Sequence, residues 1–419
     1  MSALQRKLLL LFALLLAVQA GGNLIQYLLL VRESGRFGGD FISFWQAAHR
    51  VRAGDLAAIY NPEAWRRVLA AGTPHQITWF PYPPFALFGL WPLGRLSYAA
   101  AVAVWSVAPL PFYAALTWRL AKRTGLGETP DGSGGGGMSR APAYAVLAAL
   151  TLPLLCANLF SGQTGTFIAA LFLGAAYFWP RRPILAGICI GLLAIKPQLG
   201  LLLPFALLAA GQWRVIAAAA ATILALVVAS TLWLGPAIWA DYLSMTQVFA
   251  QLMGHGYAGL RLMALGPYIS LQAAGAPVAV SAFLQAIVSL TVLAAIVRVF
   301  WRPPVDGEDG RLDLRLGLLA AGALLATPYA LSYDTPMLAL AILPLLARAW
   351  RRGWDGLELA AVTGLVVLPY ATPILMRVHV PAGLGALLLC FWALWRRYAR
   401  EAPTRDEAPA ERSPQLASA

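Results

Sequence analysis

Residues 8–31 read LLLLFALLLAVQAGGNLIQYLLLV, and residues 38–45, shortly after them, read GGDFISFW. The first stretch is apolar and long enough to cross a bilayer as a helix. It lacks a convincing small-residue cleavage site, so we interpret it as an uncleaved first span rather than a signal peptide. The second stretch begins where the chain should leave the bilayer, and its two glycines allow a tight turn before Asp40. Together they predict a membrane protein that presents a carboxylate at the membrane surface.

The composition of the whole chain also indicates a membrane protein. Of its 419 residues, 60% are hydrophobic and only 12% are charged, and the mean hydropathy is +0.68. A soluble domain is typically about 45–50% apolar and about 25% charged. Because apolar runs recur along the chain, we expect an all-α polytopic membrane protein with a bundle of about 12 transmembrane helices. The later spans are expected at residues 97–119, 142–160, 166–180, 183–195, 198–210, 215–235, 278–300, 316–329, 335–348, 357–376 and 382–396.

The connections between these spans divide the chain into a membrane domain and a tail. Residues 1–400 are expected to form the transmembrane domain, and residues 401–419 a disordered cytoplasmic tail. Residues 83–95 are apolar but short for a span, so we interpret them as a juxtamembrane or re-entrant piece. The other connections are a long first outer loop with juxtamembrane helices at 32–96, a flexible cytoplasmic linker at 120–141, and a second outer loop at 236–277.

The net charge of +13 is spread over many short loops, so it reports membrane topology and does not indicate a nucleic-acid partner. The distribution of Lys and Arg predicts that both termini are cytoplasmic. That topology places five notable polar residues on the outer face: Asp40, Gln163, Lys196, His255 and Asp334. The three cysteines lie within apolar runs without metal-ligand spacing, which favours a role as small buried hydrophobes.

Asp40 and Lys196 are the two residues most indicative of chemistry. A carboxylate among aromatic residues at a membrane surface is costly unless the protein uses it, so we interpret Asp40 as the chemical centre. The alternative is that Asp40 caps the following helix. Lys196 lies between two short apolar runs and precedes Pro197. A compact cation at such a break is suited to a phosphate, and the alternative is a lysine that snorkels to the interface.

Further polar and aromatic residues are candidate ligands for a sugar or an acceptor, with Arg261 as a second candidate for the phosphate. The sugar or acceptor candidates are Trp45, Tyr82, Gln163, His255, Tyr333 and Asp334. Each has a structural alternative: the aromatic residues suit an interfacial belt, Asp334 a helix cap, Gln163 its own turn, and His255 an exposed loop. No pair of His, Cys or carboxylate residues has convincing metal spacing, so we expect no metal and no other cofactor.

A set of short motifs occurs in a fixed order along the chain. They are Gly38-Gly39-Asp40-Phe41 with Trp45, Gly54-Asp55, Ile59-Tyr60-Asn61-Pro62, Tyr82-Pro83-Pro84-Phe85, Gly162-Gln163-Thr164-Gly165, Gly187 and Gly191 before Lys196-Pro197, and Tyr333-Asp334. Their order and spacing, over roughly residues 5 to 400, resemble glycosyltransferase family 87, membrane enzymes of the GT-C superfamily. Residues 125–141 of the linker are not part of that resemblance.

The resemblance implies a GT-C-like fold and a specific reaction. It implies transfer of a hexose, often mannose, from a polyprenyl-phosphate donor to a lipid or glycan acceptor on the outer face of a bacterial-type cytoplasmic (inner) membrane. It implies Asp40 as general base and Lys196 near the donor phosphate, without a metal. The chemistry agrees, because a positioned carboxylate can accept the proton of the attacking hydroxyl, and a cation can stabilise the leaving phosphate. We expect inversion at the anomeric carbon, with membrane lipids as the only other partners.

Two other classes of function remain open at the level of sequence. A transporter or flippase of lipid-linked sugars would share the many spans, broken helices and intramembrane charges. Against it stand the lack of a detectable repeat and the location of the unusual polar groups on one predicted face. A non-catalytic scaffold for envelope assembly would tolerate replacement of Asp40 and Lys196.

Overall fold

The computed structural model describes residues 38–72, 78–128, 141–254, 258–301 and 310–401, and a few positions between 18 and 32. Several predictions therefore fall outside the described residues. They are most of the first span, residues 129–140 of the linker, His255, and the tail from residue 402. The regular structure of the described residues is helical, and the one β-bridge among them joins Ala264 to Leu331.

The segment predicted as the first outer loop folds into a layer of short helices, which we call the cap (residues 38–95). Its elements are α2 (Phe41–Ala53), α3 (Ala57–Tyr60), α4 (Pro62–Gly72), α5 (Ala86–Leu90) and the 3₁₀-helix η1 (Trp91–Arg95). The predicted turn at Tyr60-Asn61-Pro62 starts α4, because the Asn61 side chain accepts hydrogen bonds from the backbone N–H groups of Glu63 and Ala64. The prediction of helices in this segment is confirmed, and their location next to the membrane stays a prediction.

Residues 83–95 do not form a single helix. They divide between α5 and η1, each only five residues long, and both pack on α2 within the cap. The side chain of Arg52 on α2 donates a hydrogen bond to the carbonyl of Gly94 at 2.9 Å. Neither element is long enough to cross a bilayer, so this segment is part of the cap.

Four helical segments are long and apolar enough to cross a membrane among the residues described. They are residues 98–123, 142–161, 213–234 and 278–300. They correspond to α6 (Tyr98–Val107) with α7 (Leu110–Arg123), α8 (Ala141–Ser161), α12 (Trp213–Leu234) and α16 (Val278–Phe300). All four coincide with predicted spans to within a few residues.

The remaining predicted spans are helices as well, but most are shorter. They are α9 (Gly165–Phe178), α10 (Pro183–Leu192) with η3 (Leu193–Ile195), η4 (Pro197–Gly200) with α11 (Leu203–Ala209), α17 (Leu312–Ala326), η6 (Ser332–Leu338) with α18 (Ala339–Arg352), α19 (Gly356–Met376) and α20 (Ala382–Arg400). Their lengths alone do not establish which of them cross a bilayer. The count of about twelve spans therefore stays a prediction.

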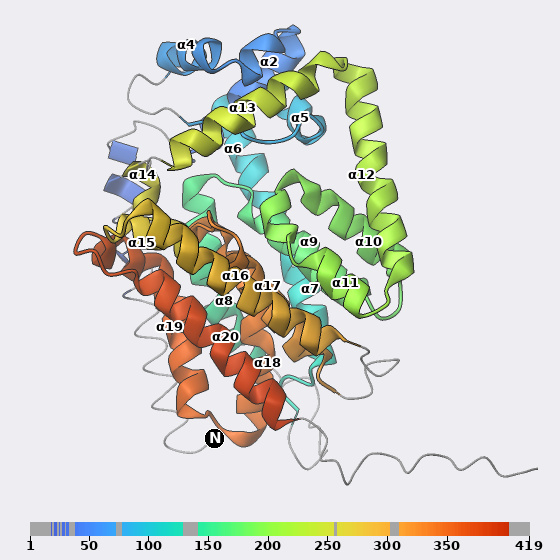
Figure 1. Ribbon diagram of the computed structural model, residues 1–419, viewed down its shortest axis with the longest axis vertical. Coiled ribbons are helices and arrows are strands. Elements are labelled where there is room, and N and C mark those ends of the chain that lie inside the picture. Colours follow the sequence, from blue (N-terminus) through green and yellow to red (C-terminus); the bar gives the residue numbers. More distant parts are fainter. Residues whose placement is uncertain are drawn as a thin grey trace, which may run out of the picture.

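The cap lies across one end of the helical bundle, as Figure 1 shows. The second outer loop joins it there through α13 (Ala237–Gly254), which extends over the same end. Tyr242 on α13 packs edge-on against Tyr60, and Trp239 packs beside Phe85. The loop continues through α14 (Ala258–Arg261) and α15 (Pro267–Ala273) before α16 begins.

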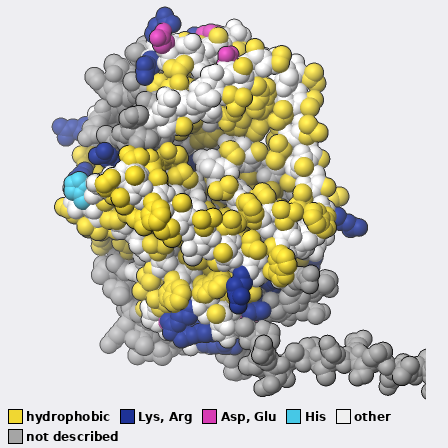
Figure 2. All heavy atoms as spheres, viewed as in Figure 1, with side chains coloured by type: hydrophobic (Ala, Val, Ile, Leu, Met, Phe, Trp, Pro, Cys, Tyr) yellow, Lys and Arg dark blue, Asp and Glu magenta, His cyan; other side chains and the backbone are white. Residues whose placement is uncertain are grey.

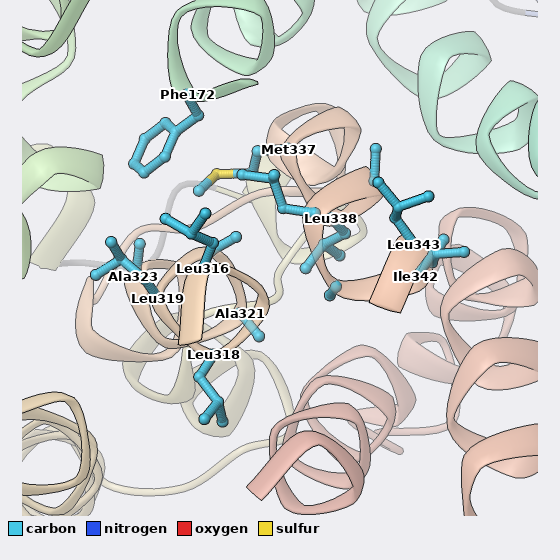
Figure 3. Packing of buried hydrophobic residues seen from close by; sticks show 14 of the residues in the cluster. Phe172, Leu316, Leu318, Leu319, Ala321, Ala323, Met337, Leu338, Ile342 and Leu343 are labelled. Atoms are coloured by element: carbon cyan, nitrogen blue, oxygen red, sulfur yellow. The ribbon is translucent and has the colours of Figure 1, made fainter. Parts of the chain in front are cut away.

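The core of the bundle is built around α17, which is buried on all sides from Leu314 to Ala326. A helix that is apolar all round belongs in the interior of a bundle. Figure 3 shows Leu316, Leu319 and Ala323 of α17 near Met337 of η6 and Phe172 of α9. Burial of η6 in the same core fixes the segment that carries Tyr333 and Asp334.

The outer surface of the bundle is apolar. Large side chains such as Leu232, Phe112 and Phe283 are 82%, 67% and 67% exposed. Figure 2 shows hydrophobic side chains across the middle of one face, with Lys and Arg mostly at its margins. A surface of this kind suits lipid rather than water.

Candidate active site

Three segments that are far apart in the sequence meet beneath the cap. They are Gly38-Gly39-Asp40, the turn at residues 161–165 between α8 and α9, and Tyr333-Asp334 at the start of η6. The turn lies at the centre because its glycines allow both neighbours to approach. A Cβ atom at Gly162, whose φ is +64°, would overlap the carbonyl oxygen of Gly38, and one at Gly165 would overlap the carbonyl oxygen of Tyr333.

The backbone holds Asp40 directly against this turn. The N–H of Asp40 donates to the carbonyl of Ser161 at 2.9 Å, and the indole N–H of Trp105 donates to the carbonyl of Gly162 at 3.1 Å. Asp40 immediately precedes α2, but its side chain makes no capping hydrogen bond to that helix. The alternative that the carboxylate serves as a helix cap is therefore wrong, and the carboxylate has a different partner.

That partner is Gln163, which belongs to a chain of hydrogen bonds. Nε2 of Gln163 donates to Oδ2 of Asp40 at 2.7 Å. The hydroxyl of Tyr82 donates to Oε1 of the same glutamine at 2.9 Å, and it also lies 3.4 Å from Oγ1 of Thr164. The cap therefore supplies Asp40 and Tyr82, and the turn supplies the amide that connects them.

The protein environment raises the pKa of Asp40 above its usual value of 3.8. Burial is the largest cause, since it disfavours the charged carboxylate. The hydrogen bond from Gln163 and the positive charge of Lys196 act in the opposite direction and lower the pKa. Asp40 is thus a partly desolvated carboxylate whose charge depends on these two neighbours.

Lys196 and Asp334 form a buried ion pair beside this chain. Lys196 falls at the break between η3 and η4, and its side chain lies inside the protein, 6% exposed. Its Nζ is 2.5 Å from Oδ1 of Asp334, while Oδ2 of Asp334 accepts the backbone N–H of Leu331 at 3.2 Å. The ammonium also lies 4.6 Å from the centre of the Tyr333 ring, a cation–π contact. The snorkelling alternative for Lys196 is therefore wrong.

A small cavity of ≈ 120 Å³ brings most of these side chains together. Asp40, Tyr82, Gln163, Lys196 and Tyr333 all line it. Asp334 does not line it, although it pairs with Lys196, which does. Five of the nine predicted site residues therefore line the same cavity.

An apolar groove of ≈ 850 Å³ adjoins the cavity, and Tyr82 and Ile195 line both. It follows α9 from Thr164 to Phe178, a distance of about 21 Å at the helical rise of about 1.5 Å per residue. Its other walls come from α5, α6, α7 and α10. The lining is almost entirely apolar, with one charged residue, Arg119.

Two predicted ligands do not line the cavity, and a third lies outside the described residues. Trp45 is half-buried, and its indole N–H donates to the carbonyl of Leu96 at 3.2 Å. Arg261 is exposed at the end of α14 and does not line the cavity. His255 lies outside the described residues.

The cavity is also lined by residues that were not selected as ligands from the sequence. They are Gln198, Phe249 and Tyr329. Gln198 follows Lys196-Pro197 directly in the sequence, and this closeness to Lys196 could have identified it as a candidate ligand. Phe249 comes from α13 in the second outer loop, and no local sequence pattern connects that helix to Asp40. Among the described residues, no group of three or more His, Cys, Asp and Glu side chains is arranged to hold a metal ion.

The fold and the site define a helical membrane protein with a carboxylate, an amide and an ammonium group around a cavity that adjoins an apolar groove. The family model for glycosyltransferase family 87 matches residues 79–328, which is more than half of the chain. The chain belongs to this family, and it is a membrane glycosyltransferase. No curated protein and no solved structure matches it. The matched segment includes Tyr82, Gln163 and Lys196, whereas Asp40 and Asp334 lie outside it.

Proposed function

We propose that the protein transfers a hexose, with mannose favoured, from a polyprenyl-phosphate donor to a lipid or glycan acceptor. In this proposal the acceptor hydroxyl gives its proton to Asp40 as its oxygen attacks the anomeric carbon. The bond between that carbon and the phosphate oxygen breaks, and the electron pair leaves with the polyprenyl phosphate. Attack opposite the leaving group inverts the anomeric configuration. The site faces the periplasmic or external side of a bacterial-type inner membrane, with both termini in the cytoplasm.

The proposal selects Asp40 over Asp334 as the base because the two carboxylates differ in their hydrogen bonds. Both oxygens of Asp334 are occupied, one by the Lys196 ammonium and one by the Leu331 backbone N–H. Asp40 uses Oδ2 for Gln163, and Oδ1 has no hydrogen-bond partner among the described residues. A carboxylate with one free oxygen at a cavity wall can accept a proton, whereas one that neutralises a buried lysine cannot do so without cost.

Lys196 is the proposed stabiliser of the leaving phosphate. An ammonium group has three N–H donors, and Asp334 takes one of them. The ion pair and the Tyr333 ring hold the lysine in place, and Nζ retains donors for a phosphate oxygen in the cavity. A preorganised cation in a partly dry site stabilises developing negative charge more than it would in water. Arg261, exposed on α14, remains a second candidate only if its loop closes over the donor.

The apolar groove supports a lipid-linked donor. It joins the cavity at Tyr82 and Ile195 and continues along α9 among apolar side chains. A polyprenyl chain can lie in such a groove with its phosphate near Lys196 and its sugar near Asp40. The single observation that carries the proposal is therefore that a cavity lined by Asp40 and Lys196 shares Tyr82 and Ile195 with this groove.

The test uses purified protein in lipid with radiolabelled polyprenyl-phosphate mannose or polyprenyl-phosphate glucose and a membrane-lipid extract as acceptor. We expect label to enter a new product with the wild type, and the Asp40→Asn variant to lose transfer while still binding the donor. Asp241→Asn is a matched control, because this carboxylate is exposed on α13 away from the cavity. Full transfer by a folded Asp40→Asn variant would refute the assignment of the base.

The same experiment distinguishes a flippase of lipid-linked sugars. No transfer from either donor, together with movement of lipid-linked sugar across the bilayer by both the wild type and Asp40→Asn, would favour that function. Membership of a glycosyltransferase family weighs against it.

A further inference from the structure

We propose that Gln163 is a positioning residue for Asp40, and that Tyr82 acts through Gln163 by fixing the orientation of its amide. This inference rests on the proposed function, since it assumes that Asp40 is the base. It replaces the expectation that Gln163 and Tyr82 serve chiefly to contact the sugar or the acceptor.

The first step of the argument is the direction of the hydrogen bonds. The amide of Gln163 has a donor end and an acceptor end, and an ionised Asp40 can only accept. The NH₂ group must therefore face Asp40, which leaves Oε1 for the hydroxyl of Tyr82. If the amide turned over, two oxygens would face each other at Asp40. The Tyr82 hydroxyl opposes that flip because it donates to Oε1.

The second step is the rigidity of the glutamine. Gln163 lies in the turn between α8 and α9, where Gly162 and Gly165 are in close contact with the segments of Asp40 and Tyr333. Tyr82 is buried, and its ring packs 5.0 Å from the ring of Phe44 on α2. Both partners of the amide are thus fixed, so the hydrogen bond to Asp40 forms before any substrate arrives.

The third step is the consequence for the carboxylate. The hydrogen bond from Gln163 to Oδ2 restricts rotation of the Asp40 carboxylate. The direction of Oδ1 is therefore fixed as well. The hydrogen bond also favours the ionised form, as does the charge of Lys196. Besides Lys196, the titratable groups near this site are Tyr82 and Tyr333, which line the same cavity as Asp40, and Asp334, which pairs with Lys196. Gln163 is the uncharged donor that hydrogen-bonds the Asp40 carboxylate.

The experiment measures kcat/KM for sugar transfer as a function of pH in the wild type and in Gln163→Leu. A charge-assisted hydrogen bond of this kind typically changes rates by about ten- to a hundredfold when it is lost. We expect that loss at neutral pH. The midpoint of the acid limb should also move upward by about one pH unit, because the ionised carboxylate loses a stabilising donor. The deficit of Gln163→Leu should therefore shrink as the pH rises.

Tyr82→Phe is the second variant, and it keeps the ring while removing the hydroxyl. We expect a smaller upward shift of the same limb, because the amide of Gln163 then loses its fixed orientation. In the double variant, Tyr82→Phe should add no further shift to that of Gln163→Leu, since its effect passes through the glutamine. Gln198→Leu is the matched control for the limb: this glutamine lines the same cavity but makes no hydrogen bond to Asp40 in the described structure.

The outcomes separate this inference from the proposed function. If the wild type transfers no sugar, the proposed function fails, and this inference fails with it. If the wild type transfers sugar but Gln163→Leu and Tyr82→Phe leave the acid limb unchanged, only the positioning role is overturned. A rise in KM alone, without a shift of the limb, would likewise overturn it and assign Gln163 to sugar binding. If Gln163→Leu does not fold, Tyr82→Phe alone decides the matter by the same criterion.

Discussion

Replacement of Lys196 by methionine should destabilise the fold as well as abolish transfer. Methionine keeps a long unbranched side chain, so the main change is the loss of the ammonium group. Asp334 is then left buried, with its side chain 2% exposed and only the Leu331 N–H as a partner. Breaking a buried ion pair by removing one member typically costs about 3–5 kcal/mol. We expect a loss of that size, and a similar one for Asp334→Asn, which leaves the ammonium unpaired.

The double variant Lys196→Met/Asp334→Asn separates the structural role of the pair from its chemical role. Replacement of both members removes both buried charges, so its stability should return to within about 1–2 kcal/mol of the wild type instead of losing the sum of the single effects. Transfer should remain absent, because no cation faces the leaving phosphate. The measurements are denaturant unfolding in lipid–detergent micelles and the transfer assay on the same preparations. A stable Lys196→Met variant, or a double variant with additive losses, would refute the ion-pair argument, and an active double variant would refute the role in transfer.

Three further predictions address the base, the turn and the groove. Burial raises the pKa of Asp40, so the acid limb of the kcat/KM profile should have a midpoint above 3.8, and activity should be lost as the pH falls through it. A midpoint at or below 3.8 would contradict the desolvation of Asp40. Gly162→Ala should cost more stability than Gly211→Ala. Both glycines have φ near +64°, but only at position 162 would the added Cβ atom overlap a neighbouring carbonyl oxygen. Equal melting temperatures of the two variants would disprove this contact. Ala115→Trp should raise KM several-fold for a long-chain donor but not for a short-chain analogue, since Ala115 lines the groove. Ala114→Trp on the same helix is its control, and equal effects of the two tryptophans would exclude the groove as the lipid site.

The helices could be predicted from the sequence because their signal is local. The predicted span at residues 278–300 coincides with α16, and the predicted helix at residues 215–235 differs from α12 by one or two residues. Lengths were less predictable where glycine and proline interrupt an apolar run, as at residues 83–95, which fold into the cap. Residues 83–95 are apolar enough for a span, but glycine and proline divide them into two short helices. Packing of these helices on α2 determines their arrangement.

Several residues of the cavity could be selected from the sequence one by one, but their pairings could not be predicted. Asp40 and Lys196 are conspicuous because each is a charge beside an interruption of an apolar run. Their partners, however, come from 123 and 138 residues away in the sequence, and no periodicity reports such a contact. From the sequence, Asp334 could be a sugar ligand or a helix cap. In the structure its carboxylate pairs with Lys196 and also accepts the backbone N–H of Leu331 at the start of η6, so the capping role is present, and the sugar contact stays a prediction. Arg261 was assigned to a phosphate from charge alone, without any information on distance.

In the proposed mechanism, the arrangement of the two carboxylates would allow one small site to hold a base and a cation without the two neutralising each other. If Asp40 were the only acid near Lys196, the two would form a direct ion pair, and both the base and the phosphate ligand would be occupied. Asp334 takes that position instead, and it does not line the cavity. Asp40 is held by an uncharged amide, which stabilises its charge without competing for the proton. The turn at residues 161–165 makes this division possible, because it contacts the segments of both carboxylates and supplies the amide.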